Sequence, residues 1–269
     1  MITADYHVHT NFSSDSDSSM ESMIEKAIDL GLKRICITDH MDLDYPKHYR
    51  LPFVFDPKKY ADTVCTLKET YKDRITLLMG IECGIRPYLA KRFDELLKSY
   101  DFDFVISSSH LARDMDVYYP EYWEGITEEE GYLTYFNTIL DNLNSYSNFD
   151  VYGHLDYVIR YGPSKGSNYQ YLQFKDIFDE ILKKIISMGK GIEVNTAGYK
   201  YGLGHPHPNT EVLKRYKELG GTILTIGSDA HKPEHLAYDF SEVRKLLLSL
   251  GFTKYTVFEG RKPIFMDLS

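Results

Sequence analysis

Cysteine, excess positive charge and long apolar runs are all scarce in this chain of 269 residues, and each shortage excludes a class of protein. The three cysteines, Cys36, Cys65 and Cys83, are odd in number and widely spaced within apolar runs, which argues against a disulfide framework or a zinc knuckle and predicts reduced core thiols. The formal net charge is -9, so the surface lacks the broad cationic patch that phosphate-backbone binding requires. We therefore expect no nucleic-acid partner.

Membrane and export signals are also missing. No stretch approaches the roughly 20 apolar residues that a membrane span needs, and residues 1–7 contain neither a basic segment nor an apolar signal core. These absences predict a cytoplasmic protein without a membrane partner. With 43% hydrophobic residues and no internal repeat or linker, residues 1–269 are expected to form one domain. The sequence does not predict an oligomeric state.

Short β-branched runs alternate with segments of helical period, a pattern typical of a parallel sheet wrapped by helices. The seven predicted strands are Ala4–Val8, Arg34–Thr38, Thr76–Ile81, Phe104–Ser108, Val151–Gly153, Gly191–Asn195 and Thr222–Ile226, with Tyr255–Phe258 as a candidate last edge. A capping box of Ser18 and Glu21 predicts a helix that stops at Gly31. An apolar stripe from Phe174 to Ile186 predicts another that stops at Gly189. Further helices are predicted over Pro57–Tyr71, Ala90–Leu97, Glu128–Tyr146, Thr210–Leu219 and Phe240–Leu250.

Three connections are longer than a compact barrel needs, namely Met41–Asp56, Leu111–Thr127 and Leu155–Tyr169. Each follows a predicted strand, and long loops in that place are usually functional. The middle loop is rich in aromatic residues, which are Tyr118, Tyr119, Tyr122 and Trp123. Two interpretations stay open: the rings stack on a substrate, or the loop packs on itself.

Nine side chains that can bind metal ions stand at the ends of the predicted strands or just beyond them. They are His7, His9, Asp15, His40, Glu82, His110, His154, Asp229 and His231. Parallel strands of a barrel end on one face, so these residues are expected to converge there. The alternative is a set of separate, hydrogen-bonded core residues. So many buried imidazoles and carboxylates around one rim would be costly without compensating cations, and we therefore favour a metal cluster.

These motifs resemble those of the PHP (polymerase and histidinol phosphatase) superfamily of metal-dependent phosphoesterases, and the resemblance spans nearly the whole chain. It implies a distorted (β/α)7 barrel, of the α/β class, with usually three metal ions at the carboxyl ends of the strands. It further implies that His7, His9, Glu82 and Asp229 hold one ion, and that Glu82 bridges to a second ion held by His110 and His154. His40 and His231 would hold the third.

The third ion is where the sequence departs from that pattern, because Asp15 stands where many members have a histidine. A carboxylate can replace imidazole as a ligand for a hard metal ion, so we assign Asp15 to this site. Asp17 is the alternative, and both could instead be solvated residues before a helix. The ligand set suits two or three divalent ions of zinc, manganese, iron or cobalt without selecting one.

Within the superfamily the chain is most similar to the stand-alone histidinol-phosphatases. The segments that carry this similarity are 153–161, from Gly153 to Tyr161, and 192–198, from Ile192 to Gly198. The resemblance implies hydrolysis of L-histidinol phosphate to L-histidinol and phosphate, with a small phosphorylated molecule as the binding partner. Two alternatives remain: a phosphoesterase for another small ester, and a metal-loaded module without catalysis.

Catalytic roles fall to three residues. Glu82 is expected to bridge two ions, Arg160 to stabilise negative charge on the phosphoryl group, and Asp229 to pass a proton to the leaving oxygen. The predicted substrate contacts are Arg160, Asn195, Lys200 and His207, although Arg160 and Lys200 also fit ordinary surface charges and His207 ordinary loop structure. The run Ser107, Ser108, Ser109 lacks a glycine-rich elbow, so a serine nucleophile is disfavoured.

Overall fold

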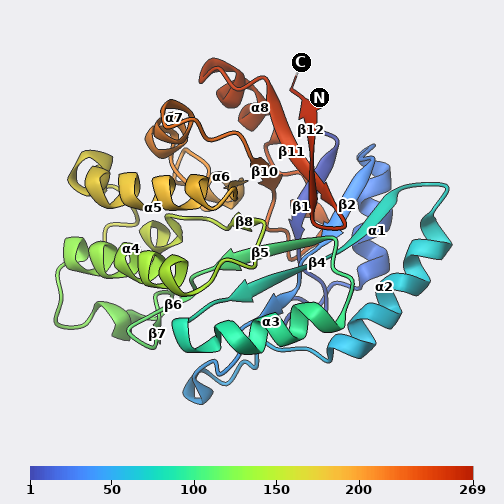
Figure 1. Ribbon diagram of the computed structural model, residues 1–269, viewed down its shortest axis with the longest axis horizontal. Coiled ribbons are helices and arrows are strands. Elements are labelled where there is room, and N and C mark those ends of the chain that lie inside the picture. Colours follow the sequence, from blue (N-terminus) through green and yellow to red (C-terminus); the bar gives the residue numbers. More distant parts are fainter. Residues whose placement is uncertain (269) are drawn as a thin grey trace.

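A barrel of parallel strands wrapped by helices forms the centre of the computed structural model, which describes residues 1–268 (Figure 1). Its strands are β1 (Ala4–Val8), β2 (Arg34–Ile37), β3 (His40–Met41), β4 (Thr76–Gly84), β5 (Phe104–Ser108), β8 (Val151–Tyr152), β9 (Gly191–Asn195) and β10 (Leu224–Gly227). The order is β1-β2-β4-β5-β8-β9-β10, and β3 pairs with β4 beyond the end of β2. At the carboxyl end, Ala230 closes the ring, since its carbonyl accepts from His9 N at 2.9 Å. The predicted seven-stranded barrel is confirmed and is nearly closed.

The helices cover the outside of the barrel with one apolar face each. They are α1 (Met20–Asp29), α2 (Pro57–Tyr71), α3 (Ala90–Ser99), α4 (Glu128–Ser145), α5 (Lys175–Ser187), α6 (Ala197–Lys200), α7 (Thr210–Glu218) and α8 (Phe240–Ser249). In α5, Phe178, Ile181 and Ile185 are fully buried, as their spacing of three and four predicts. The predicted capping box of α1 is wrong. Ser19, not Ser18, is the N-cap and accepts from Ser22 N.

A hairpin of β11 (Lys254–Glu259) and β12 (Lys262–Asp267) seals the amino end of the barrel. The expectation that Tyr255–Phe258 would be the last edge of the barrel sheet is therefore wrong, because β11 pairs antiparallel with β12 in a separate sheet. The Tyr6 hydroxyl donates to Phe258 O at 2.8 Å, and Arg261 in the hairpin turn donates from Nε to Asp150, just before β8. The hairpin does not cover the carboxyl end, where the loops that follow the strands lie.

Short elements fill the long loops at the carboxyl end. A small hairpin of β6 (Leu111–Ala112) and β7 (Met115–Asp116) and the 3-10 helix η3 (Pro120–Trp123) lie after β5, and the 3-10 helix η4 (Tyr157–Tyr161) lies after β8. The other 3-10 turns are η1 (Lys47–Tyr49), η2 (Pro87–Leu89), η5 (Tyr171–Phe174) and η6 (Pro233–His235). These turns give the loops fixed backbone conformations, so their side chains have defined positions above the barrel.

The cysteines are free thiols, as expected, but only two of them are in the core. Cys36 and Cys83 are buried, whereas Cys65 is exposed on α2, because the buried stripe of that helix runs through Tyr60, Val64 and Leu67. No helix found within residues 1–268 is long and apolar enough to cross a membrane.

Candidate metal centre

The carboxylate of Glu82, on β4, lies at the centre of the predicted ligand cluster and is fully buried. Its Oε1 is 2.9 Å from His154 Nε2 and 3.3 Å from His110 Nε2. Its Oε2 is 2.8 Å from His40 Nδ1 and 3.3 Å from His7 Nε2. One side chain thus touches imidazoles that follow or belong to four different strands, as a carboxylate bridging two ions would require.

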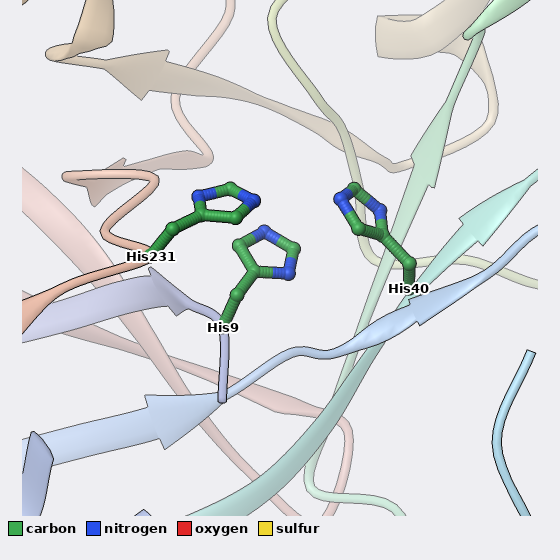
Figure 2. Close-up of side chains that lie close together, drawn as sticks. All are labelled: His9, His40 and His231. Atoms are coloured by element: carbon green, nitrogen blue, oxygen red, sulfur yellow. The ribbon is translucent and has the colours of Figure 1, made fainter. Parts of the chain in front are cut away.

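Two further carboxylates complete the ring around the remaining histidines. Asp229 Oδ1 is 3.3 Å from His9 Nε2 and 3.6 Å from His231 Nδ1. Asp15 Oδ2 is 3.1 Å from His231 Nε2 and 3.7 Å from His40 Nε2. Figure 2 shows the imidazoles of His9, His40 and His231 gathered together; the His9 ring centroid is 4.2 Å from each of the other two. All nine predicted residues are therefore brought together, and their role as ligands stays a prediction.

The choice between Asp15 and Asp17 follows from these positions. Asp15 contacts two cluster imidazoles and lines the cavity above them. Asp17 is exposed, and no ion pair or hydrogen bond found within residues 1–268 joins its side chain to the cluster. Asp15 therefore stays the predicted carboxylate ligand.

Several buried polar atoms in the cluster lack a hydrogen-bond partner among the described residues. They include His7 Nε2, His9 Nε2 and Glu82 Oε2, and all three point into the cluster. A buried polar atom without a partner costs free energy, and a row of imidazole nitrogens and carboxylate oxygens without thiolate suits divalent cations of intermediate hardness. The residues present therefore fit a multinuclear metal site.

The mutual electrostatics of the cluster also favour cation binding. Burial would raise the pKa of Glu82, but the neighbouring imidazoles, led by His7, outweigh burial and hold that pKa well below its usual range. Burial would lower the pKa of His110, but the carboxylates of Asp42 and Glu82 raise it to about 10. Burial and the imidazoles of His231 and His40 hold the pKa of His9 well below its usual range. In the metal-free protein, protons on some imidazoles therefore neutralise the carboxylates.

Two acidic residues that the sequence reasoning missed orient the ligand imidazoles from behind. Glu193 Oε1 lies 2.5 Å from His7 Nδ1, and Asp42 Oδ1 lies 2.7 Å from His110 Nδ1. A carboxylate that accepts the Nδ1 proton leaves the Nε2 lone pair free for a metal ion and fixes the ring plane. The available signal for Glu193 was a charged residue inside the apolar strand β9, which buries all five residues.

His9 has a similar but longer support. Its Nδ1 lies 3.1 Å from Ser13 Oγ, and Ser13 Oγ donates to Asp39 Oδ1 at 2.6 Å. Asp39 also accepts from Thr10 N and Thr10 Oγ1, so it holds the whole turn after β1 in place. The sequence places Asp39 beside His40 but does not reveal that the Asp39 carboxylate accepts hydrogen bonds from the turn after β1.

Asp229 has a left-handed backbone conformation with φ of 53°. Aspartate adopts this conformation more readily than most residues other than glycine. Asn195 Nδ2 lies 3.3 Å from Asp229 Oδ2, and Lys200 Nζ donates to Asp229 O at 3.2 Å. Asn195 is fully buried behind Asp229 and does not line the cavity, so the structure places it as a support rather than as the predicted substrate contact.

A cavity of about 510 Å³ opens directly above the cluster. Its walls include Asp15, His40, Tyr45, Phe53, His110, Asp116, Tyr118, Tyr119, His154, Tyr157, Arg160, Tyr161, Lys200, Tyr201, Asp229, His231 and His235. A larger hollow of about 580 Å³ beside α2 is lined by solvated side chains such as Lys58 and Asp62, so volume alone does not mark the site. The cavity above the cluster combines aromatic walls with a few charged groups, as ligand sites usually do.

Arg160 lies in this cavity wall and is held by aromatic rings. Its guanidinium carbon is 4.4 Å from the ring centroid of Tyr157, 4.7 Å from that of Tyr161 and 4.3 Å from that of Tyr201. Its Nε and Nη1 are buried without a hydrogen-bond partner among residues 1–268. No carboxylate pairs with it in that part of the chain, so the ordinary surface ion pair is disfavoured and the cation stays available to an anionic ligand.

Some residues singled out from the sequence lie away from the cavity. His207 is fully buried, its Nδ1 lies 2.5 Å from Asp156 Oδ1, and it does not line the cavity, contrary to the predicted substrate contact. Tyr122 and Trp123 bond to the backbone of their own loop and of α4, whereas Tyr118 lines the cavity. Self-packing therefore describes Tyr122 and Trp123, and stacking of Tyr118 on a substrate stays a prediction.

Comparison with known proteins agrees with this geometry. A model of the PHP domain matches residues 5–197. The histidinol-phosphatase of Lactococcus lactis subsp. lactis (strain IL1403) is 32% identical over 268 residues, which are 97% of this chain and 96% of that protein. A "probable histidinol-phosphatase" of Clostridium acetobutylicum is 35% identical over 269 residues, 98% of this chain and 96% of that protein.

A solved structure shares the whole architecture. It is the histidinol phosphate phosphatase of Lactococcus lactis subsp. lactis Il1403, crystallised in complex with zinc, L-histidinol and phosphate. The TM-score is 0.90 at 31% identity, and the match covers 97% of this chain and 98% of that one.

We expect metal binding to release protons and to strengthen as the pH rises. His110, whose pKa is raised to about 10, and His40, whose pKa the carboxylates hold above its usual range against burial, carry protons at neutral pH in the metal-free protein. An incoming cation must displace those protons, and a higher pH removes that competition. Calorimetric titration of the metal-free protein with Zn²⁺, in two buffers of different ionisation enthalpy, measures the protons released.

Asp42→Asn should reduce the proton release, because it removes the leading cause that raises the pKa of His110, and should weaken metal affinity about 10- to 100-fold. Asp62→Asn, an exposed carboxylate on α2, is the matched control. An affinity that stays constant between about pH 6 and pH 8 would contradict this account.

Proposed function

Because the chain belongs to the PHP domain family, we propose that it is a metal-dependent phosphomonoesterase that hydrolyses L-histidinol phosphate to L-histidinol and inorganic phosphate. One observation carries the proposal: a buried carboxylate, Glu82, surrounded by imidazoles at the floor of a cavity whose wall holds the unpaired cation of Arg160. The relatives aligned over nearly their whole length, and the similar structure with L-histidinol and phosphate bound, support the substrate.

The metal assignment follows the contacts described above. His7, His9, Glu82 and Asp229 would hold one ion, Glu82 with His110 and His154 a second, and Asp15, His40 and His231 a third. Divalent ions in such a site lower the pKa of bound water and polarise phosphoryl oxygens, so that no protein nucleophile is needed. Ser108 fits this view, since its hydroxyl donates to Glu82 at 2.7 Å and is occupied.

The side chains of the chain itself supply binding and proton transfer. Arg160 and Lys200 present positive charge to the cavity, where negative charge spreads over the phosphoryl oxygens during hydrolysis. Burial lowers the pKa of Lys200, and the Lys200 side chain lines the cavity. Neighbouring imidazoles hold the pKa of Asp229 well below its usual range against burial. Its carboxylate would therefore first take a proton from the attacking water and then pass that proton to the leaving alcohol oxygen, while Asn195 and Lys200 hold Asp229 in position.

The setting of the enzyme follows from composition and from the family. The net charge of -9 supports a small phosphorylated substrate rather than nucleic acid. Residues 1–269 would act as one PHP-type barrel domain in the cytoplasm, the compartment of amino-acid biosynthesis.

Phosphate release from L-histidinol phosphate, measured beside a panel of simple phosphate esters, tests the proposal. The purified protein, reconstituted with Zn²⁺ or Mn²⁺, should prefer the first compound clearly in kcat/KM, and chelation should abolish turnover. Broad and weak hydrolysis would instead indicate a general phosphoesterase. Tight metal binding without hydrolysis would indicate a non-catalytic module.

Asp229→Asn should lower kcat about 100- to 10,000-fold while the affinity for inorganic phosphate changes much less, because the amide keeps the shape but cannot carry the proton. Metal content must be measured for the variant, since Asp229 is also an assigned ligand. Unchanged turnover with all ions retained would remove Asp229 from proton transfer.

Arg160→Met should lower kcat/KM about 100- to 1000-fold through loss of charge stabilisation. Tyr201→Leu should show a smaller loss of the same kind, because it removes one ring that holds the guanidinium. Tyr201→Phe keeps the ring and is the matched control. Tyr201 is 57% exposed, so both variants should fold, and equal kinetics for the two would contradict a role of the ring.

A further inference from the structure

A second unpaired charge, of opposite sign to Arg160, lies in the wall of the same cavity. Asp116, on β7, is only 7% exposed, and no cationic side chain among residues 1–268 forms an ion pair with it. It is not one of the nine predicted ligands. Burying a carboxylate without a counter-charge is costly, so the arrangement calls for an explanation.

Two hydrogen bonds hold the Asp116 carboxylate in a fixed orientation. The Tyr45 hydroxyl donates to Oδ2 at 2.5 Å, and Tyr118 N donates to Oδ1 at 2.8 Å. An ionised carboxylate has about four acceptor positions, so each oxygen can still accept from a ligand. Burial raises the pKa of Asp116, as expected for a carboxylate whose partners are neutral.

The surroundings of Asp116 suit a small organic cation. It shares a narrow part of the cavity with Tyr45, Phe53 and Tyr157, whose rings present apolar and π-electron surface. The same part borders the metal centre, where it is lined by Asp15, His40, Asp42 and His110. Ammonium groups bind well where a carboxylate and aromatic faces meet. Arg160 projects into the same cavity from the loop after β8, while Asp116 projects from the loop after the neighbouring strand β5. Arg160 and Asp116 thus place charges of opposite sign, neither of them in an ion pair with another described residue, in the wall of one cavity.

We propose that Asp116 binds the protonated amino group of the substrate and thereby selects amino-alcohol phosphates over other phosphate esters. The inference rests on the proposed function, since L-histidinol phosphate carries an anionic phosphate and an ammonium group on one short chain. A ligand of that kind pairs both unpaired charges of the cavity at once. An ester without the amino group leaves the buried Asp116 carboxylate without a cationic partner, which penalises the binding of that ester.

The test compares two esters that differ only in the amino group, L-histidinol phosphate and 3-(imidazol-4-yl)propyl phosphate. The wild-type protein should favour the first in kcat/KM. Asp116→Asn should lower kcat/KM for L-histidinol phosphate about 10- to 100-fold, the range expected for one hydrogen bond to a charged group. The same variant should hydrolyse the ester without the amino group nearly as well as the wild type does, which also shows that it is folded.

Two matched variants sharpen the comparison. Tyr45→Phe removes a hydrogen bond to Asp116 but keeps its charge, so it should retain a preference for the amino ester. Asp73→Asn makes the same charge change at an exposed site and controls for net charge. An equal loss on both esters in Asp116→Asn would overturn the inference, because it would indicate a structural role for the loop.

The outcomes separate this inference from the proposed function. A wild-type protein that hydrolyses both esters with equal kcat/KM would overturn amino-group recognition and leave the phosphatase assignment intact. A wild-type protein, loaded with metal, that hydrolyses neither ester would overturn the phosphatase assignment and amino-group recognition with it.

Discussion

The buried carboxylate of Glu82 is the group around which the cavity floor is organised. It has no exposure to solvent, and its two oxygens touch imidazoles from β1, β3 and the segments after β5 and β8. Burying a single negative charge without a partner costs free energy. Here imidazoles surround the Glu82 carboxylate, and cations could bind between them and its oxygens. The barrel makes this possible, because only strands that end at one rim can deliver side chains so distant in sequence to one point.

The order at that point comes from groups that do not line the cavity of about 510 Å³. Glu193 and Asp42 fix the rings of His7 and His110 from behind, and Asn195 donates to the Asp229 carboxylate. Each contact converts a flexible side chain into a rigid one before any ligand arrives. The cavity therefore combines a rigid floor with walls formed by loops.

The sequence alone could predict the barrel and the convergence of the nine candidate ligands, because both depend on local patterns: apolar strands, helical stripes, and polar residues where strands end. It could not predict the partners of those residues. Whether Glu193 meets His7 depends on how β9 stands relative to β1 across the barrel, and no local pattern encodes that. The same limit applies to Asn195 and His207, which the sequence predicts at the substrate. It applies also to Tyr255–Phe258, which the sequence predicts as a barrel edge although β12 pairs with it.

The hairpin β11–β12 covers the amino end of the barrel, so structural contacts and the candidate site lie at opposite ends. Hydrogen bonds from Tyr6 to Phe258 and from Arg261 to Asp150 join the hairpin to the amino end of the barrel, whereas the candidate ligands gather at the carboxyl end. Loops at the opposite rim can then lengthen, shorten or exchange residues with little penalty to the scaffold. Substitutions in those loops can then change the shape and charge of the cavity without disturbing the contacts that hold the amino end together.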